Sequence, residues 1–305
     1  MNTLIIRTGG LGDTILTLGA AQWLKESGRH VTVMAHGGYR EIADLFGFAF
    51  IAEEESGFES IYSETSAKLR VILGGFDTII AIKADMTADM TAGLAKASSG
   101  RAFRIAPLPP MDYEKPYSLY LAESIAKTLG IAPPSEPPFP KPLAGWKKCD
   151  QLTATIHSGS GSPKKNWPFN NFMSLARTLA GERAARVNII FGPAELERME
   201  DAVKKAGTLE DVNIVTNPGY GRLAAILLKS SVYIGCDSGV THLAAALGVP
   251  TVALFGPSNA KVWRPAGTRV KIMAAEDGDM ESIRVEQVIE AVNTASQGCG
   301  ATEPL

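Results

Sequence analysis

Residues 232–257, VYIGCDSGVTHLAAALGVPTVALFGP, decide the fold of this chain. The segment opens with an apolar, β-branched run that predicts a buried strand. A helix of small residues is expected from Asp237, and Gly248 and Pro250 end it. A second apolar run at 251–255 predicts another strand. Strand, helix and strand form a βαβ unit, whose right-handed crossover makes the two strands parallel.

This unit also predicts a ligand site at one edge of a parallel sheet. Ligands of such sheets bind beyond the carboxyl ends of the strands, so residues 237–239 and 256–258 should lie at one edge. Asp237 is expected to cap the helix, and the N–H groups after it, at the positive helix end, suit a phosphate. Simple capping by Asp237 and ordinary packing of His242 are the alternative interpretation.

Length and composition exclude several classes of protein. The 305 residues suffice for two domains of ~150 residues each. A formal net charge of -2 argues against a nucleic-acid binder. The cysteines, at 149, 236 and 299, lie far apart, which indicates a reducing compartment with no disulfide framework or zinc site. Because no apolar run reaches the ~20 residues of a membrane span, we expect a cytoplasmic protein, with peripheral contact to the inner face of the cytoplasmic membrane as an open alternative.

The N-terminal residues predict a second unit of the same kind. A strand is expected at 3–6, a glycine-containing turn at 7–13, a helix from Thr14 to Gly28, and a strand at 31–34. The turn lacks the GxGxxG spacing of dinucleotide-binding proteins, and no acidic residue ends the second strand, which argues against a nicotinamide-dependent dehydrogenase. Further along, we expect strands at 77–82 and 101–105 and helices at 87–96 and 118–129.

A run of prolines divides the chain. Proline stands at 133, 134, 137, 138, 140 and 142, which excludes a helix or a central strand there. Beyond it we expect strands at 152–157, 187–191 and 212–216 and helices at 170–179, 195–205 and 223–229. The expected domains are an N-terminal domain at 1–132, a linker at 133–150, a second domain at 151–280, and a terminal helix within 281–305 that could pack back on the first domain.

Four segments, in this order, resemble glycosyltransferase family nine, the family of the lipopolysaccharide heptosyltransferases. They read LIIRTGGLGDTILTLGAAQWLK, IHSGSGSPKKNWP, IIFGPAELE and YIGCDSGVTHLAAALGVPTVALFGPS. The D-[ST]-G-x-x-H block before FGP and the GxxGD turn are the most specific parts. The resemblance implies a GT-B fold, with two Rossmann-like, doubly wound parallel-sheet domains facing across a cleft. It also implies an inverting transfer of heptose from a nucleotide diphosphate sugar, ADP-heptose above all, to a saccharide or glycolipid acceptor without a metal or other cofactor.

On the first domain, the resemblance places the catalytic base at Asp13, which would take the proton of the acceptor hydroxyl. The alternative role of Asp13 is an N-cap for the helix that follows it. The acceptor side is expected to be built from Gly10, Lys83, Arg101 and Arg104. Because Glu53, Glu54 and Glu55 offset these basic side chains, the sequence shows no broad basic face for a polyanionic lipopolysaccharide core.

On the second domain, the resemblance places a positive charge against the donor diphosphate. Lys165 would neutralise this group, although a loop lysine is also commonly just solvated. The remaining donor-binding residues are expected to be Ser160 in the same loop, Glu195 on the ribose, Asp237 on the sugar hydroxyls, Ser238 and Gly239 on the diphosphate, and His242 on the inner face of the helix. Glu195 could instead serve only the helix dipole. A DxD sequence at 277–279 is interpreted as a solvated turn away from this edge, not as a metal site.

Two other functions use the same scaffold. A nucleotide-sugar epimerase would need additional acid and base carboxylates in the second-domain cleft, and the sequence shows no convincing set. A noncatalytic nucleotide-sugar-binding subunit would keep the donor site alone, and the presence of Asp13 argues against it.

Overall fold

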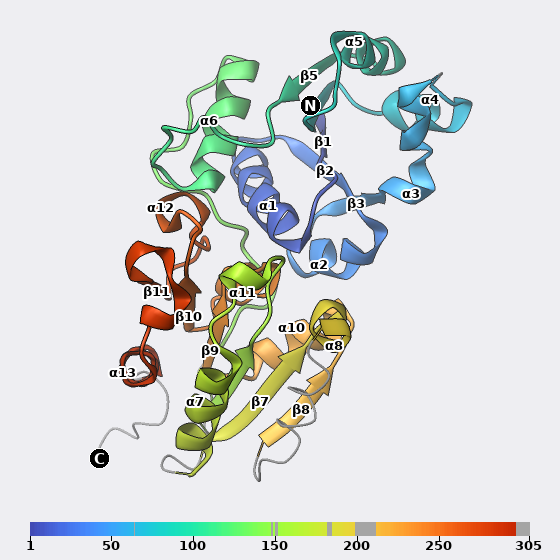
Figure 1. Cartoon of the computed structure of the whole chain (residues 1–305). Coiled ribbons are helices and arrows are strands. Elements are labelled where there is room, and N and C mark those ends of the chain that lie inside the picture. Colours follow the sequence, from blue (N-terminus) through green and yellow to red (C-terminus); the bar gives the residue numbers. More distant parts are fainter. Residues whose placement is uncertain (64, 148, 150–151, 182–184, 199–211, 297–305) are drawn as a thin grey trace, which may run out of the picture. The chain divides into compact units, whose positions relative to one another are not determined.

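The computed structural model describes all residues except 64, 148, 150–151, 182–184, 199–211 and 297–305 (Figure 1). Its contacts divide the chain into two compact units, Met1–Ala144 and Gly145–Leu305. Each unit is built on one parallel sheet. The two sheets confirm the predicted class of two Rossmann-like α/β domains.

The first unit holds a five-stranded sheet in the order β3-β2-β1-β4-β5. Its strands are β1 (Asn2–Ile6), β2 (His30–Ala35), β3 (Ala49–Ala52), β4 (Thr78–Ile82) and β5 (Arg101–Ile105). Its helices are α1 (Leu11–Glu26), α2 (Arg40–Leu45), α3 (Glu53–Ser56), α4 (Ala67–Leu73), α5 (Ala88–Ala97) and α6 (Tyr117–Leu129), with the 3₁₀ helices η1 (Gly37–Tyr39) and η2 (Phe58–Tyr62). The strand order reverses between β1 and β4, so the switch point where such sheets bind ligands lies beyond these two strands.

The second unit holds a six-stranded sheet in the order β11-β10-β9-β6-β7-β8. Its strands are β6 (Thr153–His157), β7 (Arg186–Phe191), β8 (Val212–Thr216), β9 (Val232–Cys236), β10 (Thr251–Phe255) and β11 (Val270–Ala274). Its helices are α7 (Phe169–Gly181), α8 (Pro193–Arg198), α10 (Tyr220–Leu228), α11 (Gly239–Ala246), α12 (Ala260–Trp263) and α13 (Val285–Ser296), with η3 (Pro163–Lys165), η4 (Glu276–Gly278) and η5 (Met280–Ser282). Here the switch point lies between β6 and β9.

The central strands are apolar because helices cover both faces of a parallel sheet. Every residue of β4, β9 and β10 is buried. In the second unit, Trp167 is 1% exposed, donates from Nε1 to the Ile283 carbonyl at 2.8 Å, and meets the Phe172 ring edge-on. This core fixes the loop that precedes α7.

The terminal helix α13 belongs to the core of the second unit. Val288, Ala291 and Val292 are at most 5% exposed and pack with residues of β9 and β10. The apolar face of this helix is thus buried within its own unit, and packing of the terminal segment on the first domain stays a prediction.

Two edge strands, β3 and β11, were not predicted. Both are short and half-exposed, so neither shows the apolar run that identified the central strands. The helix expected at 195–205 is described only as α8, because its later part lies outside the described residues. Among the described residues, no helix is both long and apolar enough to cross a membrane.

Candidate active site

Asp13 lies at the switch point of the first sheet, in the first turn of α1. The helix begins at Leu11, three residues before the predicted start, and Gly10 rather than Asp13 is its N-cap. The Asp13 carboxylate still serves the helix start, since Oδ2 accepts the N–H of Gly10 at 3.0 Å. A side chain at Gly9 would come within 2.6 Å of the same oxygen, so only glycine leaves room for this orientation. The side chain of Asp13 keeps 33% of its surface exposed.

Arg7 is the partner of Asp13 that sequence reasoning missed. Its Nη2 forms a short ion pair with Asp13 Oδ1, and its Nη1 donates to the Ile82 carbonyl at the end of β4, 3.4 Å away. Arg7 is only 6% exposed. The signal was a cation at the end of β1, six residues before the carboxylate. The guanidinium fixes one oxygen of Asp13 and leaves the group partly open to a ligand.

The structure brings one further predicted acceptor residue to this edge. Lys83 Nζ lies 3.1 Å from Thr8 Oγ1 and 3.3 Å from Asp85 Oδ1. Burial acts to lower the pKa of Lys83, but Tyr62 and Asp85 outweigh it and the pKa is raised. The ammonium group therefore stays charged at neutral pH.

Two of the predicted acceptor residues have other roles. Arg104 donates to the carbonyls of Lys83 and Ala84, at 3.2 and 2.8 Å, and so holds the turn after β4. Arg101 is the first residue of β5 and lies at the amino ends of the strands, opposite Asp13. Arg101 therefore lies away from the predicted acceptor site. Arg104 acts on the site only by holding the backbone of the turn that carries Lys83.

In the second unit, Lys165 and Asp237 form an ion pair at the switch point. Lys165 Nζ lies 2.8 Å from Asp237 Oδ2, and the Asp237 side chain is only 8% exposed. His242 Nε2 lies 3.9 Å from the other oxygen, Oδ1. The expectation that Asp237 caps the helix is wrong: Ser238 is the N-cap, and its Oγ accepts the N–H of Thr241 at 3.4 Å. Capping by serine leaves the aspartate free for lysine and histidine.

Glu195 is a buried, charged acceptor at the end of the neighbouring strand β7. Its Oε2 accepts the N–H of Gly192 at 2.8 Å and lies 3.6 Å from His157 Nε2. Burial would raise the pKa of Glu195, but His157 and the Gly192 N–H outweigh burial and lower it. A side chain at Gly159 would come within 1.8 Å of Oε1, so the loop after β6 approaches this carboxylate with its backbone.

The serines of this loop differ in their partners. Ser160 Oγ bonds to Asn166 Oδ1 at 2.6 Å and to the Ser162 carbonyl at 2.7 Å, so Ser160 shapes the loop that carries Lys165. Ser158 is 1% exposed, and its hydroxyl has no hydrogen-bond partner among the described residues. The Ser160 hydroxyl is therefore occupied within the loop, whereas the buried Ser158 hydroxyl keeps spare hydrogen-bonding capacity.

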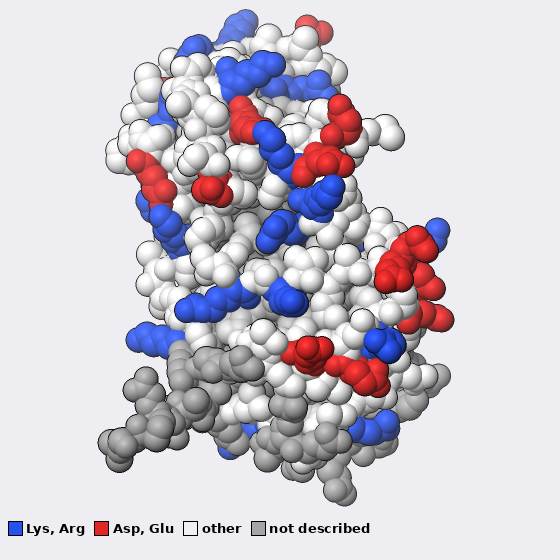
Figure 2. Space-filling model, turned by 90° about the vertical axis from the view of Figure 1, so that its left-hand side faces the viewer, with Lys and Arg blue, Asp and Glu red and all other residues white. Residues whose placement is uncertain are grey.

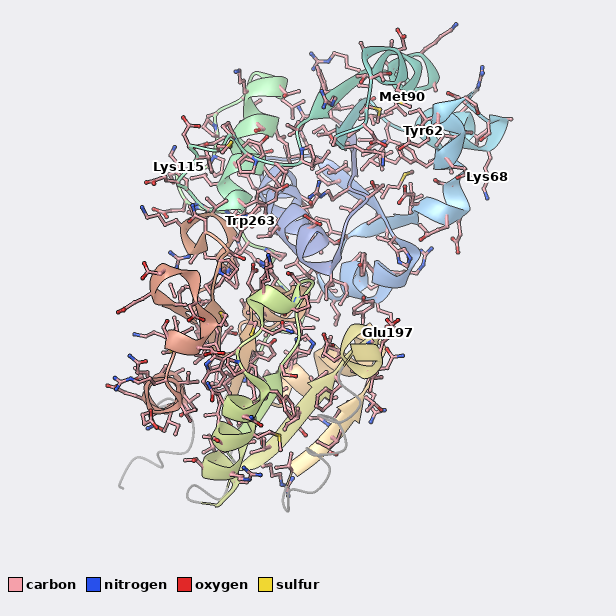
Figure 3. All side chains as sticks on the ribbon, in the orientation of Figure 1. Tyr62, Lys68, Met90, Lys115, Glu197 and Trp263 are labelled. Carbon is pink, nitrogen blue, oxygen red and sulfur yellow. The ribbon has the colours of Figure 1, made fainter. Side chains whose placement is uncertain are left out.

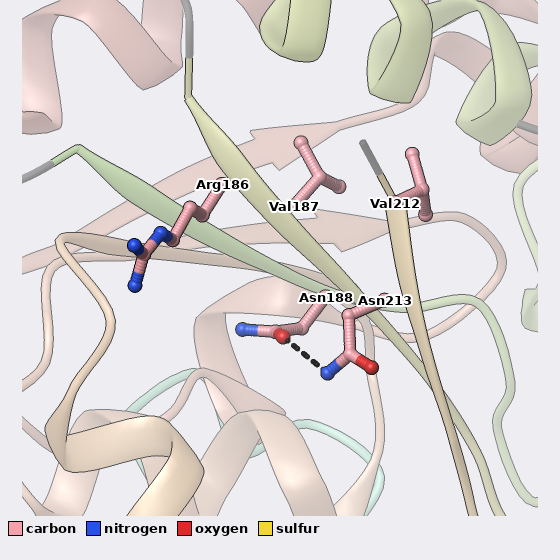
Figure 4. A pocket seen from close by; sticks show the side chains of 5 residues that line it. All are labelled: Arg186, Val187, Asn188, Val212 and Asn213. Atoms are coloured by element: carbon pink, nitrogen blue, oxygen red, sulfur yellow. Dashed lines mark hydrogen bonds between the residues drawn. The ribbon is translucent and has the colours of Figure 1, made fainter. Parts of the chain in front are cut away.

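The 277–279 turn and a surface pocket lie at opposite edges of the second sheet. The turn was expected away from the edge that carries Asp237, but a side chain at Gly278 would come within 3.2 Å of Pro257 Cα, so the turn packs beside the end of β10. A pocket lined by Arg186, Val187, Asn188, Val212 and Asn213 lies at the starts of β7 and β8 (Figure 4). The two asparagines bond to each other there at 2.9 Å, at the opposite edge of the sheet from Asp237.

The sequence model of glycosyltransferase family 9 (heptosyltransferase) matches residues 111–292. This chain belongs to glycosyltransferase family 9. The match confirms the resemblance seen in the sequence, and it contains the Lys165, Glu195 and Asp237 positions, whereas Asp13 lies outside the matched range.

Among curated family members, lipopolysaccharide heptosyltransferase 1 of Pseudomonas aeruginosa is 37% identical over 95 residues, which are 31% of this chain and 26% of that protein. Lipooligosaccharide heptosyltransferase 2 of Haemophilus influenzae is 25% identical over 126 residues, 40% of this chain and 36% of that protein. The matched part thus spans about a quarter to a third of these relatives.

Solved structures of family 9 proteins share the fold over nearly the whole chain. The Escherichia coli ADP-heptose lps heptosyltransferase II gives a TM-score of 0.75 at 16% identity and covers 98% of this chain and 99% of that one. E. coli heptosyltransferase WaaC with ADP gives 0.69 at 18% identity and covers 97% and 100%. These similarities confirm the GT-B class of the two domains.

Proposed function

We propose that this family 9 chain transfers a heptose from ADP-heptose to a hydroxyl of a saccharide or lipopolysaccharide core acceptor, with inversion and without a metal ion. The observation that carries the proposal is the Lys165–Asp237 pair, 2.8 Å long, at the start of α11. It joins a cation to a buried sugar-binding carboxylate at the site where a doubly wound sheet binds its ligand.

The donor diphosphate would lie between Lys165 and the first N–H groups of α11, which have no partner within the helix. Loss of ADP places new negative charge on the leaving phosphate, and a fixed cation and aligned N–H groups stabilise that charge. The buried Glu195 carboxylate would accept hydrogen bonds from the ribose hydroxyls. Because Lys165 already supplies positive charge, a divalent ion is not required in this scheme.

The choice of ADP-heptose rests on relatives. E. coli WaaC was solved with ADP and with ADP-2-deoxy-2-fluoro heptose, and its chain shares the fold of this one at 18% and 17% identity. Those ligands belong to that protein, and they make the adenine nucleotide the first donor to test here.

Transfer would proceed as one displacement. Asp13 takes the proton of the acceptor hydroxyl while that oxygen bonds to the anomeric carbon. The bond from the anomeric carbon to the β-phosphate oxygen breaks on the opposite side, and ADP leaves. Attack opposite the leaving group inverts the configuration. If the acceptor is a glycolipid, the proposal includes peripheral contact with the inner membrane surface.

The test is calorimetry and thermal shift with ADP, GDP, UDP and their sugars, with and without EDTA, followed by product analysis with ADP-heptose. Selective, EDTA-insensitive binding of ADP with an inverted glycoside product is expected. Epimerised sugar without transfer would indicate the epimerase, and binding without turnover would indicate a noncatalytic subunit. A requirement for metal would contradict the mechanism.

A further inference from the structure

Tyr62, Lys83 and Asp85 form a cluster beside the proposed base, which we call the Tyr62 cluster. Tyr62 Oη donates to Asp85 Oδ2 at 2.8 Å, and Lys83 Nζ lies 5.7 Å from the centre of the Tyr62 ring. Lys83 also contacts Thr8, which belongs to the same turn as Asp13. Since β1 and β4 are neighbours in the sheet, this cluster and Asp13 share the switch point of the first unit.

The cations at this edge are held by carboxylates of the same unit. Lys83 pairs with Asp85 and also lies in the field of the half-buried Glu53. The other pairs are Arg7 with Asp13, His36 with Glu54 at 3.1 Å, and Arg40 with Glu55 at 3.2 Å. Arg104 is occupied by the backbone carbonyls described above. Among the described residues named here, five carboxylates outnumber three arginines and one lysine, so this set carries no surplus of positive charge.

The surface away from this edge carries both acidic and basic side chains (Figure 2). On the face seen in Figure 2, acidic and basic side chains lie next to one another at some places, and other basic side chains lie without an acidic neighbour. A phosphate or carboxylate placed at the Tyr62 cluster would meet the negative charge of Asp85 and the field of Glu53. Like charges placed together across an interface are strongly unfavourable.

A sugar without charge suits the same groups. Ionised carboxylates only accept hydrogen bonds, and sugar hydroxyls donate them. The side chain of Tyr62, which is labelled in Figure 3, adds a rigid surface that is apolar on its face and polar at its tip. Tyr62 is 50% exposed. Aromatic surface beside hydrogen-bond acceptors matches a sugar ring, which has apolar C–H faces and polar edges.

We propose that the Tyr62 cluster binds an uncharged, hydroxyl-rich sugar unit of the acceptor and disfavours a phosphorylated or carboxylated one. This inference rests on the proposed function, because it takes Asp13 as the base and the first unit as the acceptor domain. The inference narrows the range of expected acceptors, from any saccharide or lipopolysaccharide core to those that present a neutral sugar at this cluster.

The experiment compares two acceptor probes with ADP-heptose as donor: the methyl glycoside of L-glycero-D-manno-heptose and its 4-phosphate. We expect kcat/KM to favour the neutral probe by about tenfold or more. Tyr62→Ala should raise KM for the neutral probe by about fivefold with little change in kcat, because the ring binds and does not react. Binding of both probes is also measured by saturation-transfer NMR, which needs no turnover.

Asp85→Asn tests the role of charge more directly than Tyr62→Ala. It removes the negative charge of Asp85 and leaves Lys83 without this carboxylate partner. The variant should improve the phosphate probe relative to the neutral one by about threefold to tenfold. Glu26→Gln is the matched control, because it removes the partner of Lys141 at the far end of α1 and should leave the ratio unchanged.

Tighter binding or faster use of the 4-phosphate by the wild-type chain would overturn the inference, and so would a ratio that Asp85→Asn does not move. NMR binding of neither probe would also overturn it. Failure of the proposed function is recognised separately, as loss of ADP binding and of any turnover of ADP-heptose, while probe binding is still scored by NMR.

Discussion

Both sheets carry ion-paired carboxylates at the carboxyl ends of their strands, but these carboxylates differ in how exposed they are. In the first unit, the carboxylates are open, with Asp13 33% and Asp85 56% exposed, although their cationic partners Arg7 and Lys83 are only 7% and 17% exposed. In the second unit, the side chains of Asp237, Glu195 and His157 are all at most 8% exposed. Buried polar groups held by neighbours are fixed in advance for a ligand of constant structure, and open groups can accommodate different ligands. The second edge therefore suits the proposed nucleotide-sugar donor, and the first suits the proposed acceptor.

Among the tests of this contrast, the Asp13→Asn variant should have the largest effect. We expect kcat to fall by about 10²- to 10⁴-fold, because proton removal by a positioned base contributes that much. ADP affinity should stay within about twofold, since the base acts only as charge develops on the acceptor oxygen. Initial rates and calorimetry measure the two effects. Glu286→Gln, which removes a first-turn carboxylate from α13, is the control. Near-wild-type turnover would remove Asp13 from the role of base.

Lys165→Met tests the second edge, with Lys164→Met as its neighbour control. Removing Lys165 takes away a charge from the donor phosphate and leaves the buried Asp237 without its ion pair. We expect kcat/KM for the donor to fall by about 10- to 100-fold. Lys164 is exposed, so its replacement should change little. Equal losses in both variants would show that the two lysines act only through general charge.

The sequence predicted the layers and the order of the chain well, because buried parallel strands are apolar throughout. The 232–257 segment folds as β9, α11 and β10 as expected. The roles of individual side chains were harder to predict. Whether Asp237 or Ser238 caps α11 depends on where Lys165 lies, 72 residues earlier in the chain. Tyr62 was missed for the same reason, since its partner Asp85 lies 23 residues later in the chain. Arg7 was missed although its partner Asp13 lies only six residues later, because the contact depends on how the turn between them folds.

A smaller effect is expected from Glu195→Gln, with the exposed Glu197→Gln as control. Replacing the charged acceptor by a neutral one should weaken ADP binding by about 3- to 10-fold, the difference between a charge-assisted and a neutral hydrogen bond. The variant also has a pH signature. Because the pKa of Glu195 is lowered in the folded chain, its charge stabilises the fold above the ordinary value of 4.5, and this stabilisation is lost as the pH falls through the folded pKa.

Melting temperatures at pH 7 and pH 4 measure this effect. The fall between the two pH values should be smaller in Glu195→Gln than in the wild type, while Glu197→Gln should behave as the wild type does. An identical fall in all three proteins would mean that the contacts of Glu195 with His157 and Gly192 do not favour its charged form.

The smallest expected effect concerns the 277–279 turn, which shares the second edge with the donor residues. The DxD sequence packs beside the end of β10, so its replacement tests the metal-independent mechanism. Asp279 already has a structural role, because its Oδ1 accepts the N–H of Glu281 at 3.0 Å and caps η5. The Asp277→Asn, Asp279→Asn double variant should keep kcat/KM within about twofold, with or without EDTA, and change stability by less than about 0.5 kcal/mol, because Asn caps a helix about as well as Asp. A large loss of activity that added Mg²⁺ or Mn²⁺ reverses would reassign the charge stabilisation from Lys165 to a bound cation. The second edge would then hold its ligand through a metal as well as through fixed side chains.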